Sequence, residues 1–153
     1  MSIPSNDVPV TPRILLAESS LPLRRVMREA LTAFRQCEVD DASGGERAFE
    51  MALRRPYDLF LFALELPDLP GDQMDRLLTQ AYPLAHPGRH TSPPVIFLTA
   101  KTDTERAQQL KSHARVLGVL PMPPKIDQLL ALTQRLLPAR ADAAPPPFSP
   151  NVP

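Results

Sequence analysis

The sequence lacks an excess of charge of either sign, has one cysteine and contains no long apolar run. Its 17 Lys and Arg balance 17 Asp and Glu, and the basic residues are scattered, which excludes a nucleic-acid footprint and a polybasic membrane patch. The lone Cys37 excludes an internal disulfide and is typical of a reducing compartment. No stretch approaches the roughly 20 apolar residues of a membrane span, and the N-terminus lacks the pattern of a signal peptide. We therefore expect a cytoplasmic protein without nucleic-acid or membrane partners.

Proline is concentrated at the two ends of the chain. Residues 1–12 and 138–153 together hold nine of the 20 prolines and show little apolar periodicity. Such segments cannot bury enough apolar surface to offset the entropy of ordering them. We expect a flexible N-terminal lead at 1–12, one folded domain at 13–137 and a disordered proline-rich tail at 138–153.

The stretch at residues 57–71 is an almost unbroken apolar run that breaks into a turn of Pro, Asp and Gly. This pattern is typical of a central strand of a parallel sheet, because both faces of such a strand are covered by helices. Ligands collect at the carboxyl edge of such sheets. Here the strand ends at about Ala63, whose methyl side chain has no reactive or ligating group.

Four further short apolar runs alternate with helical patterns on either side of the central strand. Strands alternating with helices predict an α/β fold, a doubly wound five-stranded parallel sheet with right-handed crossovers and helices on both faces. The four further strands are expected at residues 13–17, 37–40, 95–98 and 116–120.

The helical segments carry recognisable start signals and apolar faces. Ser20 is expected to cap the first helix, and capping-box patterns that begin at Ser43 and Thr102 are expected to open the second and the fourth. Val26 and Leu77 fall on the apolar faces of the first and third helices. The residues at 83–93 exceed the usual loop length, and we expect them to form a surface insertion.

The order of these motifs resembles the receiver domain of bacterial response regulators, the CheY-like family, across residues 13–137. The resemblance rests on Arg24-Arg25 after the first strand, the Leu-Pro-Asp-x-x-Gly turn at 66–71, Leu98-Thr99-Ala100, and Leu120-Pro121-Met122-Pro123. It implies a flavodoxin-like sheet of strand order 2-1-3-4-5, a cis bond before Pro123, and a place in two-component signal transduction or a phosphorelay.

The residues that carry phosphate chemistry in that family are altered here. Family members hold a phosphate on an aspartate at the end of the third strand, beside Mg²⁺, an acidic pair and a lysine, because phosphoryl transfer needs these charges to converge. The aspartate position falls on Ala63, the acidic pair on Glu18 and Ser19, and the lysine on Met122, while the switch threonine is kept as Thr99. The resemblance thus implies a degenerate pseudo-receiver with no catalytic activity, no bound metal and no cofactor.

Several polar residues have an interpretation that needs no function. Thr99 is expected to be a retained strand-end residue, and Glu65 and Asp68 to be solvated turn residues, although either acid is an alternative acceptor. The same applies to three arginines, expected on a solvated helix face, and to three surface histidines without metal-ligand spacing: Arg24, Arg25, Arg28, His86, His90 and His113.

Two functions from different classes fit this pattern. The first is a stand-alone, phosphorylation-independent interaction module whose partner is a histidine kinase, another regulator or a scaffold. The resemblance implies that its contact face is formed by the fourth helix, fifth strand and fifth helix, including Leu110 and Val119, and that this face can also form a homodimer. The alternative is a sensor of a small molecule or nucleotide anion at the altered strand edge.

Overall fold

The short apolar runs of the sequence become the strands of one parallel sheet. The computed structural model describes residues 11–140, and the sheet within this range has the expected order β2-β1-β3-β4-β5. Every pairing is parallel, so the doubly wound fold class is confirmed. The strands are β1 (Arg13–Ala17), β2 (Glu38–Ala42), β3 (Leu59–Ala63), β4 (Val95–Thr99) and β5 (Val116–Pro121). The helices are α1 (Leu21–Phe34), α2 (Gly45–Arg54), α3 (Gly71–Ala85), α4 (Glu105–Lys111) and α5 (Ile126–Thr133).

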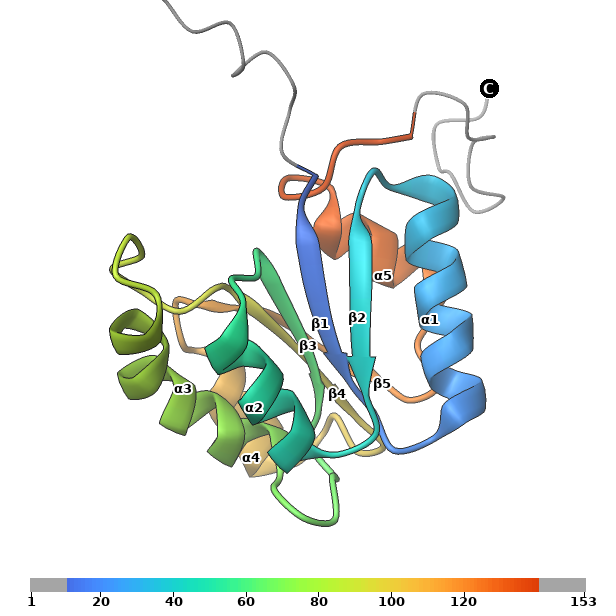
Figure 1. Cartoon of the computed structure of the whole chain (residues 1–153). Coiled ribbons are helices and arrows are strands. Elements are labelled where there is room, and N and C mark those ends of the chain that lie inside the picture. The colour runs from blue at the N-terminus through green and yellow to red at the C-terminus, as the bar shows by residue number, and fades with distance from the viewer. Residues whose placement is uncertain (1–10, 141–153) are drawn as a thin grey trace, which may run out of the picture.

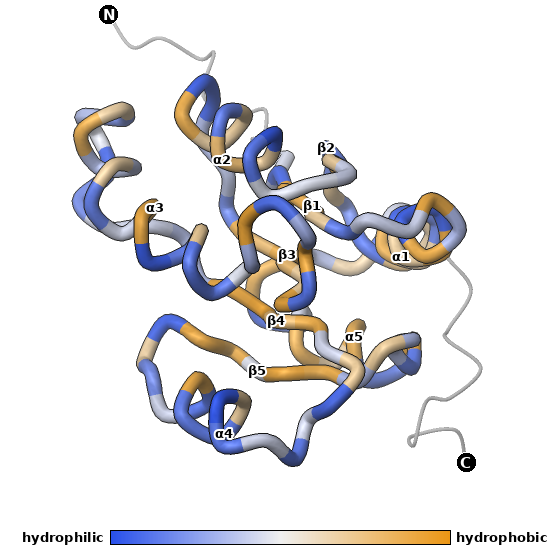
Figure 2. The backbone as a smooth tube through the Cα atoms, turned by 90° about the horizontal axis from the view of Figure 1, so that it is seen from below, coloured by the Kyte–Doolittle hydropathy of each residue, from blue (hydrophilic) through white to orange (hydrophobic). Residues whose placement is uncertain are grey.

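Two layers of helices cover the sheet. α1 and α5 lie on one face, and α2, α3 and α4 lie on the other (Figure 1). Seen along the strands, apolar residues follow β3, β4 and β5 through the middle, while polar residues dominate the surrounding loops (Figure 2). None of the helices between residues 11 and 140 combines the length and apolarity required to cross a bilayer.

The central strand is anchored by aromatic packing. All five residues of β3 are buried, and the rings of Phe60 and Phe62 stack with centroids 4.7 Å apart. Tyr82 of α3 meets Phe60 edge-on at 5.8 Å, and its hydroxyl accepts a hydrogen bond of 2.8 Å from the backbone N–H of Tyr57. Burial of each such ring stabilises the fold by about 1.5–3 kcal/mol. These contacts hold β3 in place, so that Ala63 lies at the carboxyl edge of the sheet.

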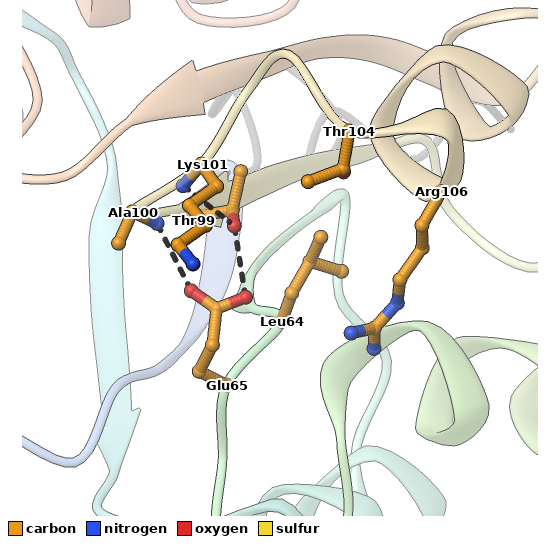
Figure 3. Close-up of a pocket in the computed structure, with 7 residues that line it drawn as sticks. All are labelled: Leu64, Glu65, Thr99, Ala100, Lys101, Thr104 and Arg106. Atoms are coloured by element: carbon orange, nitrogen blue, oxygen red, sulfur yellow. Dashed lines mark hydrogen bonds between the residues drawn. The ribbon is translucent and has the colours of Figure 1, made fainter.

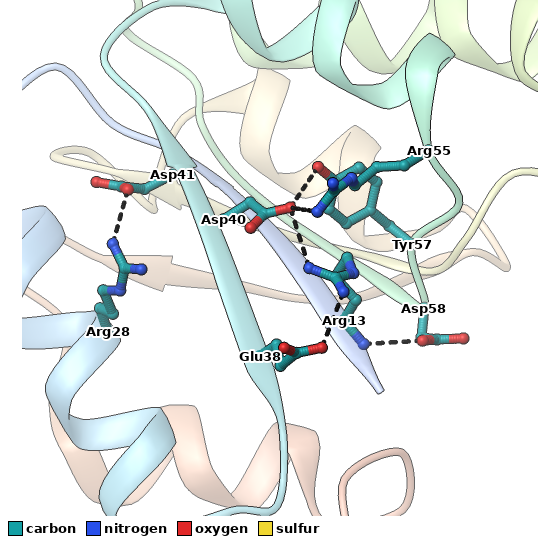
Figure 4. Close-up of polar contacts among 8 residues, drawn as sticks. All are labelled: Arg13, Arg28, Glu38, Asp40, Asp41, Arg55, Tyr57 and Asp58. Carbon is teal, nitrogen blue, oxygen red and sulfur yellow. Dashed lines mark hydrogen bonds and ion pairs between the residues drawn. The ribbon is translucent and has the colours of Figure 1, made fainter. Parts of the chain in front are cut away.

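Two acidic residues on the edge strand β2 form ion pairs with arginines on the two opposite faces of the sheet. Because neighbouring strand residues point to opposite faces, Asp41 pairs with Arg28 of α1 at 3.0 Å, while Asp40 pairs with Arg55 at 3.2 Å (Figure 4). The Asp40 carboxylate also accepts a 2.8 Å hydrogen bond from the hydroxyl of Tyr57. Burial, and then this hydrogen bond, raise the pKa of Tyr57, so its hydroxyl remains a donor.

The start of α2 differs from the sequence prediction. The capping box expected from Ser43 is not formed, because the N-cap is Gly44, which offers no side chain. The Asp68 carboxylate, from the β3–α3 loop (residues 64–70), instead accepts hydrogen bonds from the backbone N–H groups of Gly45 and Glu46 at 2.9 and 3.0 Å. A carboxylate here satisfies orphan donors and opposes the positive end of the helix dipole. Asp68 is exposed in its turn, as predicted, but it also caps α2 from another loop, which the sequence does not predict.

The other two predicted caps have different outcomes. Ser20 caps α1 as expected, since its hydroxyl oxygen accepts from the N–H of Leu23. The capping box that begins at Thr102 is wrong by two residues, because Thr104 is the N-cap of α4 and accepts from the N–H of Ala107 at 3.1 Å. The local pattern locates the helix correctly but not its first residue.

The helix α3 continues past Pro83 to Ala85, so the connection expected at residues 83–93 starts later. The proline is tolerated because Tyr82, on the same turn, is fully buried and anchors the helix end. The connection lies at the surface, as expected, since residues 87–91 are exposed, but hydrogen bonds tie it to the domain. Arg89 donates to the carbonyl of Tyr57 at 3.0 Å, and a ring nitrogen of the half-buried His86 lies 2.7 Å from the carbonyl oxygen of Ala52.

Two predictions of burial and the start of one predicted strand also need correction. Val26 and Leu77 are expected on inward faces but are 49% and 50% exposed, because the apolar stripes of α1 and α3 are wider than their contact with the sheet. Cys37 precedes β2, which starts at Glu38, and is half-buried. Burial raises the pKa of the Cys37 thiol to about 11, although Arg35 acts in the opposite direction, so the thiol stays protonated at neutral pH.

The chain after α5 returns to α1. The carbonyl of Pro138 accepts from the N–H of Gln36 at 2.7 Å, and Arg140 donates its N–H to Phe34 at 3.1 Å. The sequence places these residues in the tail, whereas the structure has them hydrogen bonded to the end of α1. The rest of the expected tail and residues 1–10 of the expected lead lie outside the described residues.

Replacing Asp68 by alanine is expected to lower the free energy of unfolding by about 1 kcal/mol near neutral pH, because α2 loses its cap. The N–H groups of Glu46 and Gly45 lower the pKa of Asp68 in the folded state. Its contribution is therefore complete above the unfolded-state pKa of about 3.9 and disappears as the pH falls through the lower folded-state value. Urea unfolding of wild type and Asp68→Ala at several pH values measures this.

Asp103→Ala is the matched control for this experiment, since Asp103 is exposed and caps no helix. A difference between wild type and Asp68→Ala that stays constant down to the most acidic pH, or that equals the control at neutral pH, would contradict the capping role.

Candidate functional site

The carboxyl edge of the sheet brings together four of the five residues predicted for the altered phosphate site. Ala63 and Thr99 end β3 and β4, and Glu18 follows β1. Met122 follows β5 and donates its backbone N–H to the carbonyl of Thr99 at 3.0 Å. Ser19, the fifth, is exposed in the loop that leads to α1. Glu18, Ala63, Thr99 and Met122 thus lie at the ends of adjacent parallel strands, where the fold places ligand sites.

The end of β3 is closed by its own chain. Ala63 is 5% exposed, and the next residue, Leu64, donates its N–H to the carbonyl of Leu98 at 2.8 Å. A Cβ added at Gly71 would lie 2.2 Å from the carbonyl oxygen of Ala63, so only glycine lets α3 begin this close to the strand. The last position of β3 therefore holds a methyl group, and its carbonyl lies against the tightly packed start of α3.

The carboxylate of Glu18 is directed to its own loop. It is 6% exposed and accepts from the N–H of Ser20 at 2.7 Å and from the hydroxyl of Ser19 at 3.4 Å. These bonds stabilise the turn between β1 and α1. Glu18 thus satisfies backbone donors at the sheet edge.

Arg24 of α1 lies across the same loop. Its guanidinium donates to the carbonyl oxygens of Glu18 and Ser19 at 2.8 and 3.2 Å and pairs with Asp41 at 2.9 Å. Its side chain is only 13% exposed. The prediction of a solvated helix face is therefore wrong for Arg24, which links the end of β2 to the β1–α1 loop.

Thr99 and the residue after it are bound by Glu65 (Figure 3). The Thr99 hydroxyl donates to one carboxylate oxygen of Glu65 at 2.8 Å, and the Ala100 N–H donates to the other at 3.0 Å. The backbone N–H of Lys101 donates in turn to the Thr99 oxygen at 3.3 Å. Glu65 is exposed in its loop, as expected, but it also binds the first residues after β4, which the sequence does not predict.

An open hollow lies beside this contact, between the ends of β3 and β4 and the start of α4. Its other boundary is an ion pair in which Arg106 of α4 donates to both carboxylate oxygens of Asp72 in α3. Burial alone raises the pKa of Asp72, but the hydrogen bonds and charge of Arg106 outweigh it, so the pKa lies below its ordinary value. The lining residues are Leu64, Glu65, Thr99, Ala100, Lys101, Thr104 and Arg106.

The sequence matches a known protein family over most of its length. Residues 14–134 match the family described as the response regulator receiver domain. The chain belongs to the response regulator receiver family. The role in two-component signalling that the resemblance implies is thereby confirmed at this level.

Curated relatives of this receiver domain are larger proteins. The aerobic respiration control sensor protein ArcB of Escherichia coli K12 is 28% identical over 130 residues, which are 85% of this chain and 16% of that protein. The transcriptional regulatory protein SrrA of Staphylococcus aureus NCTC 8325 is 30% identical over 113 residues, which are 73% of this chain and 43% of that protein. The chain therefore spans less than half the length of these relatives.

Solved structures show the same fold. The chemotaxis protein CheY4 of Vibrio cholerae superposes with a TM-score of 0.66 at 23% identity and covers 84% of this chain and all of its own. The receiver domain of an HD domain-containing protein from Pseudomonas fluorescens Pf-5 gives a TM-score of 0.68 at 21% identity, with 82% and 94% coverage. At these identities the likeness concerns the fold alone.

The magnesium ion that the receiver family implies does not fit the residues present here. Mg²⁺ prefers six oxygen ligands in an octahedron and usually takes one or two carboxylates. At this edge Ala63 offers no side-chain oxygen, and the Glu18 carboxylate is already bound to the β1–α1 loop. Within residues 11–140 no group of three or more His, Cys, Asp or Glu is arranged to hold a metal ion.

The lysine position of the family pattern holds an apolar side chain in this receiver domain. Met122 is partly buried and packs against the core, and its bond to Pro123 is cis, as the resemblance implies. A thioether fills a gap well but carries no charge to set against an anion. Of the expected charges, only that of Glu18 is present at this edge.

Two contributors to the receiver edge, Arg24 and Glu65, are missed by the sequence-based interpretation. Their partners lie far away in sequence: Asp41 for Arg24, and Thr99 for Glu65. The only sequence signal is that each lies near a strand end whose neighbour in the sheet carries a complementary group. That signal becomes usable once the strand order is assumed.

Replacing Arg106 by methionine is expected to lower the free energy of unfolding by about 1–3 kcal/mol, because the largely buried Asp72 carboxylate loses its partner. Arg76→Met, in α3, is the matched control, since Arg76 is exposed, and should change stability by no more than about 0.5 kcal/mol. Urea unfolding measures both changes in the free energy of unfolding, provided that its dependence on urea concentration is the same in the wild type and the variants. Equal effects of the two substitutions would contradict a stabilising role of the Arg106 pair.

Proposed function

We propose that this receiver domain works without being phosphorylated, as a module that binds other signalling proteins. The single observation that carries the proposal is Ala63 at the end of β3, where the family pattern has its phosphate acceptor. A methyl group has no oxygen to attack a phosphorus atom, so phosphoryl transfer to this position is chemically impossible. We infer that the chain is not an enzyme of the family's phosphotransfer type.

The surrounding edge supports the same proposal. Glu18 is bound to its own loop, Arg24 to the backbone at that loop, and Glu65 to the end of β4. Three groups that could contribute to a charged site are thus used in holding loops together. The hydrophobic framework of the fold is retained, which suggests that the surface performs the function.

The contact face expected from the resemblance needs one correction. Val119 is 7% exposed and belongs to the core, and Leu110 is partly buried against it, so neither offers much surface to a partner. Leu117, two residues before Val119 on the edge strand β5, is 36% exposed. It lines an open hollow with Ala131, Leu132, Gln134 and Arg135 of α5 and the residues that follow.

We propose this β5–α5 hollow as the contact site for the partner. Its lining combines the apolar Leu117, Ala131 and Leu132 with the polar Gln134 and Arg135, which suits a protein surface that carries both an apolar anchor and an acidic neighbour. The candidates are a histidine kinase, another response regulator, a scaffold protein or a second copy of this chain. The cytoplasmic location expected from the sequence stays a prediction.

The alternative of a nucleotide or anion sensor is less well supported. The hollow at the strand edge presents the Glu65 carboxylate, which repels an anion. The Arg106 guanidinium beside it is already paired with Asp72. The donors at this edge, the Thr99 hydroxyl and the Ala100 N–H, are already occupied by Glu65.

Incubation of the full chain with acetyl phosphate and Mg²⁺ is expected to leave its intact mass unchanged, because Ala63 cannot accept the phosphoryl group. A receiver that retains the acceptor aspartate, treated in parallel, serves as the positive control. Stoichiometric gain of one phosphoryl group would overturn the proposed function, and peptide mapping would then identify the acceptor.

Self-association through the β5–α5 hollow is expected to depend on Leu117. Sedimentation velocity over a range of concentrations should show a dimer for the wild type and a monomer for Leu117→Lys, because a second positive charge near Arg135 that would be buried without a partner opposes the contact. Leu84→Lys is the matched control, since Leu84 is 83% exposed on α3, and it should still dimerise. A wild type that is monomeric throughout would exclude a second copy as the partner.

A further inference from the structure

Glu65 is the only acidic residue of the β3–α3 loop that reaches β4. It lies two residues after Ala63. Each of its two carboxylate oxygens accepts one hydrogen bond, from the hydroxyl of Thr99 at 2.8 Å and from the N–H of Ala100 at 3.0 Å (Figure 3). Hydrogen bonds to an ionised acceptor are shorter and stronger than bonds between neutral groups. Here two of them converge on one anion.

The donors that meet Glu65 form a small anion-binding arrangement. Thr99 is 3% exposed, so its hydroxyl has little access to water and depends on a protein acceptor. Its oxygen also receives the N–H of Lys101 at 3.3 Å, which places Thr99 between a donor and an anion. One carboxylate therefore orders three consecutive residues at the start of the β4–α4 connection.

We propose that the Glu65 carboxylate is a built-in substitute for a phosphoryl group, supplied by the chain itself. A carboxylate and a phosphoryl group are both anions that present oxygen acceptors, so the same hydroxyl and N–H donors can bind either. With Ala63 in place of an acceptor, no phosphoryl group arrives, and Glu65 keeps Thr99 and Ala100 permanently engaged. This inference rests on the proposed function, and it adds that the β4–α4 connection is fixed in one arrangement.

The rest of α4 is held independently of Glu65. Arg106, at the second residue of α4, is bound to Asp72, and Thr104 caps the helix start. Removal of the Glu65 carboxylate should therefore release only the residues between β4 and the α4 cap. A purely structural role of Glu65 would instead show itself as a loss of stability throughout the domain.

Amide hydrogen exchange of the full chain separates these two roles. In Glu65→Ala the N–H of Ala100 loses its acceptor, and its exchange should accelerate by at least about tenfold, as expected for loss of a hydrogen bond to a charged group. The N–H of Lys101 should follow. The N–H of Leu64 is bonded to the carbonyl of Leu98 in the same region, and its exchange should not change.

Two further variants make the test specific to the anion. Glu65→Gln retains an oxygen that can accept one bond but has no charge, and it should give exchange at Ala100 between that of wild type and Glu65→Ala. Glu105→Ala removes an exposed carboxylate from the first turn of α4 and should leave the Ala100 exchange at the wild-type rate.

Three results would overturn the inference. They are unchanged exchange at Ala100 in Glu65→Ala, full protection in Glu65→Gln, and a uniform acceleration that includes Leu64. The experiment uses neither a phosphodonor nor a partner, so its failure leaves the proposed function untouched. Conversely, a phosphorylated chain would refute the proposed function even if the exchange at Ala100 behaves as expected.

Discussion

Three carboxylates hold the carboxyl edge of this receiver domain together. Glu65 binds the end of β4, Asp68 binds the start of α2, and Asp72 binds Arg106 of α4. Backbone N–H groups at strand ends and helix starts lack partners within their own element and need acceptors. The residues that follow β3 supply these acceptors, so the loop after the central strand is tied to the elements around it.

This arrangement keeps the negative charges of the edge apart. Carboxylates that converge on one point repel one another unless a metal or an ammonium offsets them. Here Glu18 faces the N–H of Ser20, and Glu65 faces Thr99 and Ala100, so each charge has its own donors. The edge therefore needs no added cation. Its geometry is set by internal hydrogen bonds, which is consistent with a domain that presents one surface to its partners at all times.

The sequence predicts the scaffold of this domain well and its loop contacts poorly. Apolar runs and turn residues are local, so they locate the strands and, with the resemblance, their order. The acceptors of Thr99 and the start of α2 are Glu65 and Asp68, which periodicity cannot reveal because it reports faces and not which loops meet. Local rules also yield to tertiary contacts. The capping box at Ser43 gives way to Asp68, and α3 continues through Pro83 because buried side chains hold its last turn.

A crystal structure of the full chain, grown with Mg²⁺ and beryllofluoride as a phosphoryl analogue, is the decisive test of an edge that works without phosphate. We expect this edge to bind neither reagent, with the Glu65 carboxylate on Thr99 and Ala100 and no ion beside Ala63. A magnesium ion coordinated by Glu18, with the analogue bound to Thr99 and Glu65 displaced from it, would show instead that the edge retains phosphate chemistry.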